Sequence, residues 1–502
     1  GNQAKTGVSE LIELLANDDR VTAIGLYLEG FDDLEKFCRA IGQAHAKQKP
    51  VVAIKVGKTE KARIATRTHT ASLAGDAVTA SALLKHLGIV EVDSVAVFLE
   101  TLKLFHQFGA LPGNRVVSVS CSGGEASLMS DLCRDTAVEF PDFTDAQSKA
   151  LGQILGAKVT LANPLDYHTY IWGDIPTMTA CFSAIIQPNF DLAVFILDIP
   201  RSDTCDPSGH DCAIEAIINA SQENRSATKV VVVSQLAENL EEGVVQRFNQ
   251  HDIVTIHGQE TAVNVIDAVI RAGQINKGTH LRLPWIASSA EQNTQLLTED
   301  ESKQILAGYG LAVPGRIAKD NKQELIDASS SIAKPWVLKT LGIAHKTEAG
   351  GVRLNLKSQD ELIAAVETMP QNSDGYLLEQ QITDPVLELL IGISRDATGL
   401  LLLTLGAGGI LTEVHRDTAH LVLPADASQI ESALRSLRIA PLFSGYRNLP
   451  AADIKSVISA VLAVVNYAEN HVTKLVSLDI NPLIVTHSGA FAVDALIELE
   501  KD

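Results

Sequence analysis

The alternation of β-branched runs with helical stretches is the feature that most limits what this chain can fold into. Runs such as VTAIGLYLEG and PVVAIKVG alternate with amphipathic stretches up to about residue 108, and the same rhythm starts again at RVVSVSCSGG. This order is typical of parallel sheets covered by helices, because parallel strands need a long crossover connection. The apolar runs of the second set predict strands that are buried on both faces.

Two breaks divide the sequence. They are ALPGN at residues 110–114 and INKGTHLRLPW at residues 275–285. After the second break, adjacent β-rich segments and a few helices predict an α+β unit with antiparallel pairing. We therefore expect three domains, at residues 1–109, 110–283 and 284–502, which suits a length of 502 residues.

Composition narrows the class of partner. The chain has 41 Lys and Arg against 61 Asp and Glu, and this net charge of −20 disfavours non-specific binding to nucleic acid or to an anionic membrane. The longest apolar stretch, residues 399–411, is shorter than the roughly 20 residues that span a bilayer. The six cysteines lack CxxC spacing, which is typical of reduced cytosolic thiols. We expect a cytoplasmic protein that binds small molecules, and we interpret Cys205, His210 and Cys212 as an ordinary polar loop rather than a metal site.

The last domain contains two groups of residues that suit a nucleotide. Lys339 lies on a predicted strand and precedes HKTEAGGV at residues 345–352, so that an ammonium group and backbone N–H groups could share phosphate charge. Asp479 and Asn481 lie two apart on another predicted strand and so point to the same side, where their oxygens could hold Mg²⁺ together with Glu413. A surface lysine beside a routine turn, and polar residues at a strand end, are the alternatives.

These segments occur in an order that resembles an ATP-grasp domain. The order is GYGLAVP, VLKT, HKTEAGGV, YLLEQ, LLIGISRD, LGAGGILTEV and DINPL. The resemblance implies that Lys339 and Glu379 contact the nucleotide. It also implies that Glu413, Asp479 and Asn481 surround the metal and the phosphates.

The earlier part resembles the ligase half of the nucleoside-diphosphate-forming acyl-CoA synthetases, the family of ADP-forming acetyl-CoA synthetase and a relative of succinyl-CoA synthetase. The segments that carry this resemblance are GNQA, YLEG, KVGKTEKAR, THTASLAG, SCSGGEASLMSD and NPLD. With the ATP-grasp segments it covers essentially the whole chain. It implies an α/β fold, with two flavodoxin-like parallel-sheet domains of the succinyl-CoA synthetase type followed by an α+β ATP-grasp domain. It also implies that a carboxylate, ATP and CoA give acyl-CoA, ADP and phosphate through phosphohistidine and acyl-phosphate intermediates.

The resemblance assigns roles to two histidines. His69 in THTASLAG would accept a phosphoryl group from ATP, which suits an imidazole that is nucleophilic when neutral near pH 7. Glu29 in YLEG would accept a hydrogen bond from the other ring nitrogen. His345 would be a second phosphoryl carrier, although the family usually has Ser-Asp where this chain has Thr347 and Glu348. A helix-capping role for His69 and a static nucleotide-site role for His345 are the alternatives.

The segment SCSGGEAS predicts a place for the phosphate near His69. It follows a predicted strand, and Ser122, Gly123 and Gly124 can turn backbone N–H groups toward an anion at the start of the next helix. A phosphate or an acyl phosphate could be held there. A plain turn between strand and helix is the alternative.

The segment NPLDYHTYIWGD, at residues 163–174, is expected to lie at the acyl site. Asn163 belongs to the NPLD motif, and Tyr167, Tyr170 and Trp172 could line an acyl pocket. Aromatic rings can also hold a cation, so a zwitterionic acid such as a betaine or dimethylsulfoniopropionate, with ligation coupled to β-elimination, is a second hypothesis. A hydrophobic wall for a short-chain acid is favoured, and His168 is interpreted as structural.

Two other classes of function stay open at this point. A carboxylate–amine ligase of the ATP-grasp type would explain residues 284–502 but would not use a phosphohistidine domain. A non-catalytic regulator would be expected to lack His69 or the metal-site acids. The family binds CoA with an N-terminal domain, and because the sequence opens inside the family's second domain, we expect that domain in a longer chain or in a partner subunit. The family precedent suggests a homodimer or a larger oligomer.

Overall fold

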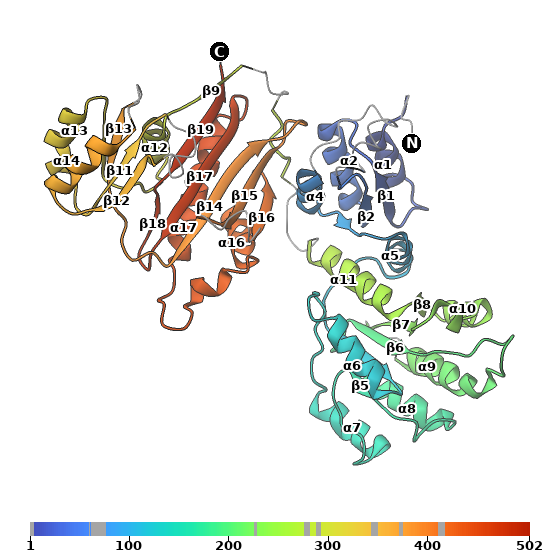
Figure 1. Ribbon diagram of the computed structural model, residues 1–502. Coiled ribbons are helices and arrows are strands. Elements are labelled where there is room, and N and C mark those ends of the chain that lie inside the picture. The colour runs from blue at the N-terminus through green and yellow to red at the C-terminus, as the bar shows by residue number, and fades with distance from the viewer. Residues whose placement is uncertain are drawn as a thin grey trace. The chain divides into compact units, whose positions relative to one another are not determined.

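The computed structural model describes most of the chain. The described residues are 5–59, 61, 77–224, 228–275, 282–287, 293–342, 350–370, 375–409 and 417–501. The chain forms two compact units, of which the first is Gly1–Ser72 with Leu87–Leu281 and the second is Leu73–His86 with Arg282–Asp502 (Figure 1). The boundaries of the three expected domains stay predictions.

The first unit begins with a small parallel sheet of strand order β1, β2, β3. Every residue of the central strand β2 is buried, which matches the apolar pattern of its first four residues. The helix α2 begins at Asp33, whose carboxylate accepts the N–H of Lys36. The elements are α1 (Val8–Ala16), β1 (Ile24–Leu28), α2 (Leu34–Ala46), β2 (Val51–Lys55), β3 (Val90–Glu91) and α5 (Val95–Phe108).

The rest of the first unit is a five-stranded parallel sheet of order β5, β4, β6, β7, β8, which is the flavodoxin-type order. Both predicted parallel sheets are thus confirmed. The strands of the five-stranded sheet are β4 (Val116–Ser120), β5 (Leu165–Asp166), β6 (Leu192–Ile196), β7 (Lys229–Ser234) and β8 (Val254–His257). Its helices are α6 (Gly123–Leu132), α7 (Asp145–Leu155), α8 (Ile175–Ile185), α9 (Asp211–Glu223), α10 (Glu242–Asn249) and α11 (Gln259–Ile275), and α11 packs against α5.

The second unit contains two antiparallel sheets, as predicted for its α+β pattern. The smaller sheet has the order β10, β13, β11, β12, and Trp336 and Leu338 lie in the core beneath it. Its elements are β10 (Arg316–Lys319), α13 (Lys322–Ala328), β11 (Trp336–Thr340), β12 (Val352–Leu356), α14 (Gln359–Thr368) and β13 (Tyr376–Gln380).

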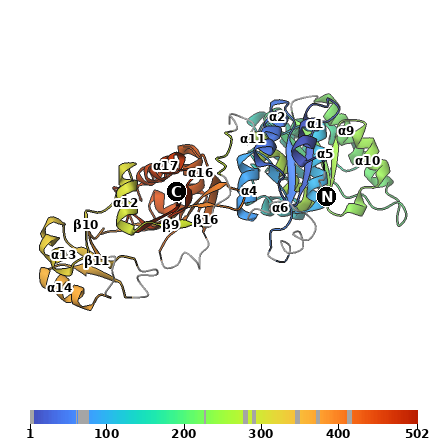
Figure 2. The same cartoon turned by 90° about the horizontal axis from the view of Figure 1, so that it is seen from above.

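The larger sheet has the order β16, β15, β14, β17, β19, β9, with β18 paired to β17. Its strands are β9 (Thr294–Leu296), β14 (Leu387–Arg395), β15 (Leu401–Ala407), β16 (Thr418–Val422), β17 (Leu475–Val485), β18 (Ala490–Ala492) and β19 (Ala495–Glu500). The helices are α4 (Ala77–His86), α12 (Glu299–Gly308), α16 (Ala427–Arg435) and α17 (Ile454–Asn470). Figure 2 shows α12 between the helices of the smaller sheet and α16 and α17, so α12 borders both halves of this unit.

Short 3₁₀ helices complete the described elements. They are η1 (Ser208–His210), η2 (Ala237–Asn239), η3 (Ser329–Ser331) and η4 (Ala440–Ser444). Among the helices of the described residues, none is both long enough and apolar enough to cross a membrane.

Candidate active site

Four charged side chains meet in the interior of the second unit, and we call them the buried quartet. They are Glu299 and Lys303 on α12, Lys339 on β11 and Glu379 on β13. Lys303 is fully buried, the two glutamates are 1% exposed, and Lys339 is 7% exposed. Charged residues are almost never buried to this degree unless they are paired, so each of these side chains needs a partner of opposite charge.

The two lysines of the buried quartet share the same partners. The Nζ of Lys339 lies 2.7 Å from Oε1 of Glu299 and 2.9 Å from Oε2 of Glu379, and it also donates to the carbonyl of Val493. The Nζ of Lys303 lies 2.6 Å from Oε1 of Glu299 and 2.6 Å from Oε1 of Glu379, and it donates to the same carbonyl. Both ammonium groups are therefore bound by two carboxylates and one carbonyl.

The charges of the buried quartet affect the two lysines differently. Burial lowers the pKa of Lys303, and the positive charge of Lys339 lowers it further against the attraction of the glutamates. Burial also acts against the charged form of Lys339, but Glu299, Glu379 and Asp494 together raise the pKa of Lys339 above its ordinary value.

The predicted metal ligands lie on one strand of the larger sheet. Asp479 and Asn481 are both on β17, and the Oδ1 of Asn481 accepts the N–H of Gly409 at 3.1 Å. Asp479 is accessible to solvent, yet desolvation by the surrounding chain, followed by repulsion from Asp494, raises the pKa of its carboxyl. A divalent cation would relieve this repulsion, and hard oxygen donors suit Mg²⁺. Glu413, the third predicted ligand, lies outside the described residues.

Three-residue metal clusters do not occur in the part of the chain that the structure describes. Within it, His, Cys, Asp and Glu side chains form no group of three or more that could hold a metal ion. Cys205, His210 and Cys212 are among the described residues and form no such group. Mg²⁺ binding at Asp479 and Asn481 stays a prediction.

Glu29 lies directly after β1, at the carboxyl edge of the small parallel sheet. Its Oε2 atom is buried, and within the described ranges no group donates a hydrogen bond to it. Its main-chain carbonyl accepts a hydrogen bond from Nζ of Lys55 at 3.1 Å. Because a buried carboxylate oxygen without a donor is costly, this atom needs a further partner. His69, the predicted partner, and His345 lie outside the described residues.

The predicted phosphate turn lies at the start of α6. Ser122 is the N-cap, and Gly123 and Gly124 are exposed in the first turn, where N–H groups have no partner within the helix. A Cβ atom at Gly123 would lie 3.2 Å from Oδ2 of Asp166. Burial raises the pKa of the nearby Glu125 carboxyl, and the charges of Asp198 and Asp166 raise it further. The turn can face an anion, but its surroundings are acidic.

The residues predicted for the acyl site have other partners. Asn163 accepts the N–H of Ser118 at 3.1 Å, and its amide donates to the carbonyls of Val116 and Pro141. These bonds tie the segment before β5 to β4.

The aromatic rings of this segment face different surroundings. Tyr167 is 4% exposed and packs edge-on against Phe182, with 5.3 Å between the ring centroids. Tyr170 is 66% exposed. Trp172 donates from Nε1 to the carbonyl of Gly209 at 3.0 Å and meets His210 edge-on. The structure therefore places Tyr167 in the core and Tyr170 at the surface, and does not gather the rings around one cavity.

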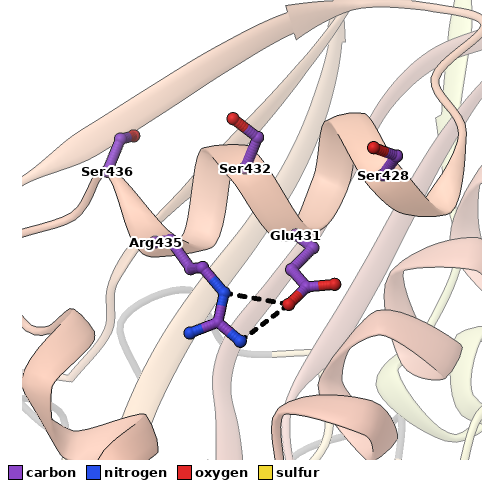
Figure 3. A pocket seen from close by; sticks show the side chains of 5 residues that line it. All are labelled: Ser428, Glu431, Ser432, Arg435 and Ser436. Carbon is purple, nitrogen blue, oxygen red and sulfur yellow. Dashed lines mark hydrogen bonds and ion pairs between the residues drawn. The ribbon is translucent and has the colours of Figure 1, made fainter.

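A shallow pocket lies on the outside of α16, and the described residues that line it include none of those predicted for the site. Figure 3 shows its lining, in which Arg435 and Glu431 form an ion pair and three serines point from the same helix. An open surface of one helix lacks the converging polar groups of a substrate site.

Sequence reasoning missed Glu299, Lys303 and Lys55. The first two form an i, i+4 pair within LTEDESKQIL, a pattern that is usually found on an exposed helix face. Lys55 is buried at the end of β2, where desolvation lowers its pKa against the attraction of Glu91 and Glu29. The available signal was its place in KVGKTEKAR, at the carboxyl end of a parallel strand.

Comparisons with known proteins match two parts of the chain to families. Residues 288–499 match the ATP-grasp domain, and residues 1–105 match the succinyl-CoA ligase like flavodoxin domain. A trans-feruloyl-CoA synthase from an unknown prokaryotic organism is 24% identical over 514 residues, which cover 100% of this chain and 72% of that protein. The ADP-forming acetate–CoA ligase I of Archaeoglobus fulgidus is 27% identical over 520 residues, covering 98% of this chain and 72% of that protein.

Two further relatives match only part of the chain. The beta subunit of the ADP-forming acetate–CoA ligase I of Pyrococcus furiosus is 28% identical over 220 residues, or 42% of this chain and 94% of that protein. A solved acetyl-coenzyme A synthetase 1 of Candidatus Korarchaeum cryptofilum is 27% identical, with a TM-score of 0.38, over 41% of this chain and 93% of that chain. The long relatives are named as CoA ligases or synthases, which are acid–thiol ligases, and they match the expected class.

The predicted fold class and the predicted resemblance are both confirmed. The parallel sheets lie in the first unit, the antiparallel sheets of the matched ATP-grasp region lie in the second, and the relatives extend across both. The chain thus combines a succinyl-CoA ligase-like flavodoxin domain with an ATP-grasp domain, and over nearly its whole length it is similar to the ADP-forming CoA ligases.

Proposed function

We propose that this protein is an ADP-forming acyl-CoA synthetase, which converts a carboxylate, ATP and CoA to acyl-CoA, ADP and phosphate. The observation that carries this proposal is that one chain contains both matched domains and is similar, across 98% of its length, to an ADP-forming acetate–CoA ligase. An amine ligase of the ATP-grasp type would leave residues 1–105 without a role. Because the relatives act on different acids by name, the acid itself is left open.

The first steps would be phosphoryl transfer from ATP to His345 and from His345 to His69. A ring nitrogen of His345 attacks the γ-phosphorus of ATP, and the bond from that phosphorus to the bridging oxygen breaks, so that ADP leaves. A ring nitrogen of His69 then attacks the phosphorus, and the N–P bond of His345 breaks. Glu29 would accept the N–H of the other ring nitrogen, which fixes the tautomer and stabilises the positive charge of the ring. The buried Oε2 atom of Glu29, to which no described group donates, supports this role.

The next steps would pass the phosphoryl group to the acid. A carboxylate oxygen attacks the phosphorus, the N–P bond of His69 breaks, and an acyl phosphate forms. The thiolate of CoA then attacks the acyl carbon and displaces phosphate. Ser122, Gly123 and Gly124 would hold the transferred phosphate with main-chain N–H groups. The acidic residues beside this turn would keep the anion from binding tightly after release.

The nucleotide would bind in the second unit. Lys339 and Glu379 would lie beside it, and Asp479, Asn481 and Glu413 would hold Mg²⁺. When bound, Mg²⁺ would neutralise part of the phosphate charge. His345 would carry the phosphoryl group from this site to His69. This transfer would allow the nucleotide and the acid to bind at separate sites.

We also propose a cytoplasmic, oligomeric enzyme that uses CoA as its second substrate. A relative named as a beta subunit, which matches 42% of this chain, supports an assembly in which related domains lie on separate subunits. A homodimer or a larger oligomer is the expected form.

The test is the overall reaction. The full-length protein is incubated with ATP, Mg²⁺, CoA and a panel of carboxylic acids, and the products are separated by mass spectrometry. We expect acyl-CoA together with ADP in equal amounts for at least one acid. Formation of AMP, or ADP formation that requires an amine in place of CoA, would overturn the proposal.

A further inference from the structure

The hydrogen bonds of Lys339 conflict with its predicted contact to a nucleotide. An ammonium group has three N–H donors. Those of Lys339 are matched by Glu299, Glu379 and the carbonyl of Val493. To bind a phosphate oxygen, Lys339 must therefore give up at least one partner in the buried quartet.

Leaving a buried carboxylate without its cation is normally expensive, because an unpaired buried charge destabilises a protein strongly. Here Lys303 contacts the same three groups as Lys339, at 2.6 Å from a carboxylate oxygen of each glutamate. If Lys339 moves away, both carboxylates and the carbonyl keep an ammonium partner. The quartet thus contains a second cation that lowers the cost of releasing the first.

Burial indicates which lysine can move. Lys303 is fully buried on α12, whereas the side chain of Lys339 is 9% exposed and is the most accessible of the four. Burial lowers the pKa of Lys303, and the charge of Lys339 lowers it further, so departure of Lys339 would remove the second of these effects and favour the charged form of Lys303. The arrangement is asymmetric, with one fixed lysine and one that can reach solvent.

One acid acts on both the buried quartet and the predicted metal site. Asp494 adds to Glu299 and Glu379 in raising the pKa of Lys339 against the effect of burial. Burial and then the charge of Asp494 raise the pKa of Asp479, which is expected to hold Mg²⁺.

We propose that Lys303 is a positioning residue, which holds Glu299, Glu379 and the Val493 carbonyl when Lys339 turns to a nucleotide phosphate. This rests on the proposed function, since it takes the nucleotide contact of Lys339 from there. Lys303 itself does not touch the nucleotide. It keeps the quartet paired in both states of Lys339.

The test compares two variants with the wild-type protein in their affinity for the ATP analogue AMP-PNP with Mg²⁺, measured by calorimetry. Lys303→Met leaves Lys339 as the only cation for two carboxylates, so Lys339 is retained and affinity falls by about tenfold to a hundredfold. The double variant Lys303→Met with Glu299→Gln restores charge balance. Its stability to urea should return toward that of the wild type. Its affinity for AMP-PNP should stay low, because release of Lys339 would now leave the buried carboxylate of Glu379 without a cation.

The matched control is Arg316→Met. Arg316 on β10 pairs with Asp300 on α12 at 2.7 Å and so joins the same helix to the same sheet without belonging to the quartet. We expect its affinity for AMP-PNP to match wild type. In steady state, the Lys303→Met variants should raise the KM for ATP and leave the KM for CoA unchanged.

Either of two results would overturn the proposal. In one, the double variant binds AMP-PNP as tightly as wild type, which would make the role of Lys303 structural only. In the other, Lys339→Met binds AMP-PNP as tightly as the wild type does, which would show that Lys339 does not contact a phosphate. If instead the affinities follow the prediction but no acyl-CoA forms with any acid, the positioning role of Lys303 is supported and the proposed function fails.

Discussion

At the scale of single residues, the account depends on buried polar atoms and their partners. Glu29 has a buried carboxylate oxygen to which no described group donates, whereas the oxygens of Glu299 and Glu379 face two ammonium groups. The Oε2 atom of Glu29 therefore needs a hydrogen-bond donor, whereas the oxygens of Glu299 and Glu379 already accept hydrogen bonds. This difference separates the predicted role of Glu29 from that of the buried quartet.

The role of Glu29 gives a prediction for Glu29→Gln. The amide keeps the size of the side chain but loses the charge that stabilises a phosphorylated imidazole. We expect the rate at which the phosphoryl group of ATP reaches His69 to fall by about a hundredfold, while the affinity for AMP-PNP is unchanged. Rapid-quench measurements test the rate. Glu35→Gln, on the exposed face of α2, is the control, and an unchanged rate in Glu29→Gln would contradict the role.

At the scale of elements, the space around a glycine shows how closely its helix approaches a neighbouring segment. Gly273 on α11 is one such position, since a Cβ atom there would lie 1.6 Å from the main-chain oxygen of Leu111. Gly42, inside α2, has open space instead. The helix α11 therefore packs directly on the ALPGN break, which joins the two parallel sheets of the first unit.

This contact predicts opposite effects for the same substitution. Gly42→Ala should raise the free energy of unfolding by up to about 1 kcal/mol, since alanine is the better helix former. Gly273→Ala should lower it by about 2 kcal/mol or more, because a main-chain carbonyl must shift. Urea unfolding of both variants tests this. Equal stabilisation by the two substitutions would show that α11 does not approach Leu111 so closely.

A buried histidine on α2 predicts a pH dependence of stability. His45 contacts the carbonyl of Leu87 through Nε2 at 2.9 Å, and burial lowers its pKa below the ordinary value of 6.5. The unfolded chain therefore binds a proton more readily, so the stability from His45 is complete above pH 6.5 and is lost as the pH falls toward the lowered pKa. His45→Gln keeps an N–H donor and cannot titrate. Urea unfolding should show a smaller loss between pH 7.5 and acidic pH in this variant, and an equal loss would contradict the prediction.

At the scale of the whole molecule, the sequence was informative where patterns are local. The β-branched runs predicted the parallel sheets because burial of a strand on both faces leaves a continuous apolar pattern. The ordered motifs predicted the ATP-grasp region, which the family match confirmed. Glu299 and Lys303 escaped notice because only tertiary packing buries an i, i+4 pair that resembles a surface pair.

The structure describes part of the predicted site. The structure brings Lys339 and Glu379 together at 2.9 Å, and it places Asp479 and Asn481 on one strand. Asn163 proved to form hydrogen bonds to β4 and to Pro141, and Tyr167 proved to pack against Phe182 in the core. A motif cannot reveal these contacts, because the partners lie elsewhere in the sequence. The roles of His69, His345 and Glu413 stay predictions.

The central claim is that a phosphohistidine links the two units in catalysis. The most direct test is to incubate the full-length protein with γ-³²P-ATP and Mg²⁺ and to measure acid-labile, base-stable label on the protein, in wild type and in His69→Ala and His345→Ala. The account predicts label in wild type that is lost on addition of CoA and the acid substrate. It also predicts label on His345 alone in His69→Ala, and none in His345→Ala. A wild-type protein that acquires no label would contradict the phosphohistidine mechanism.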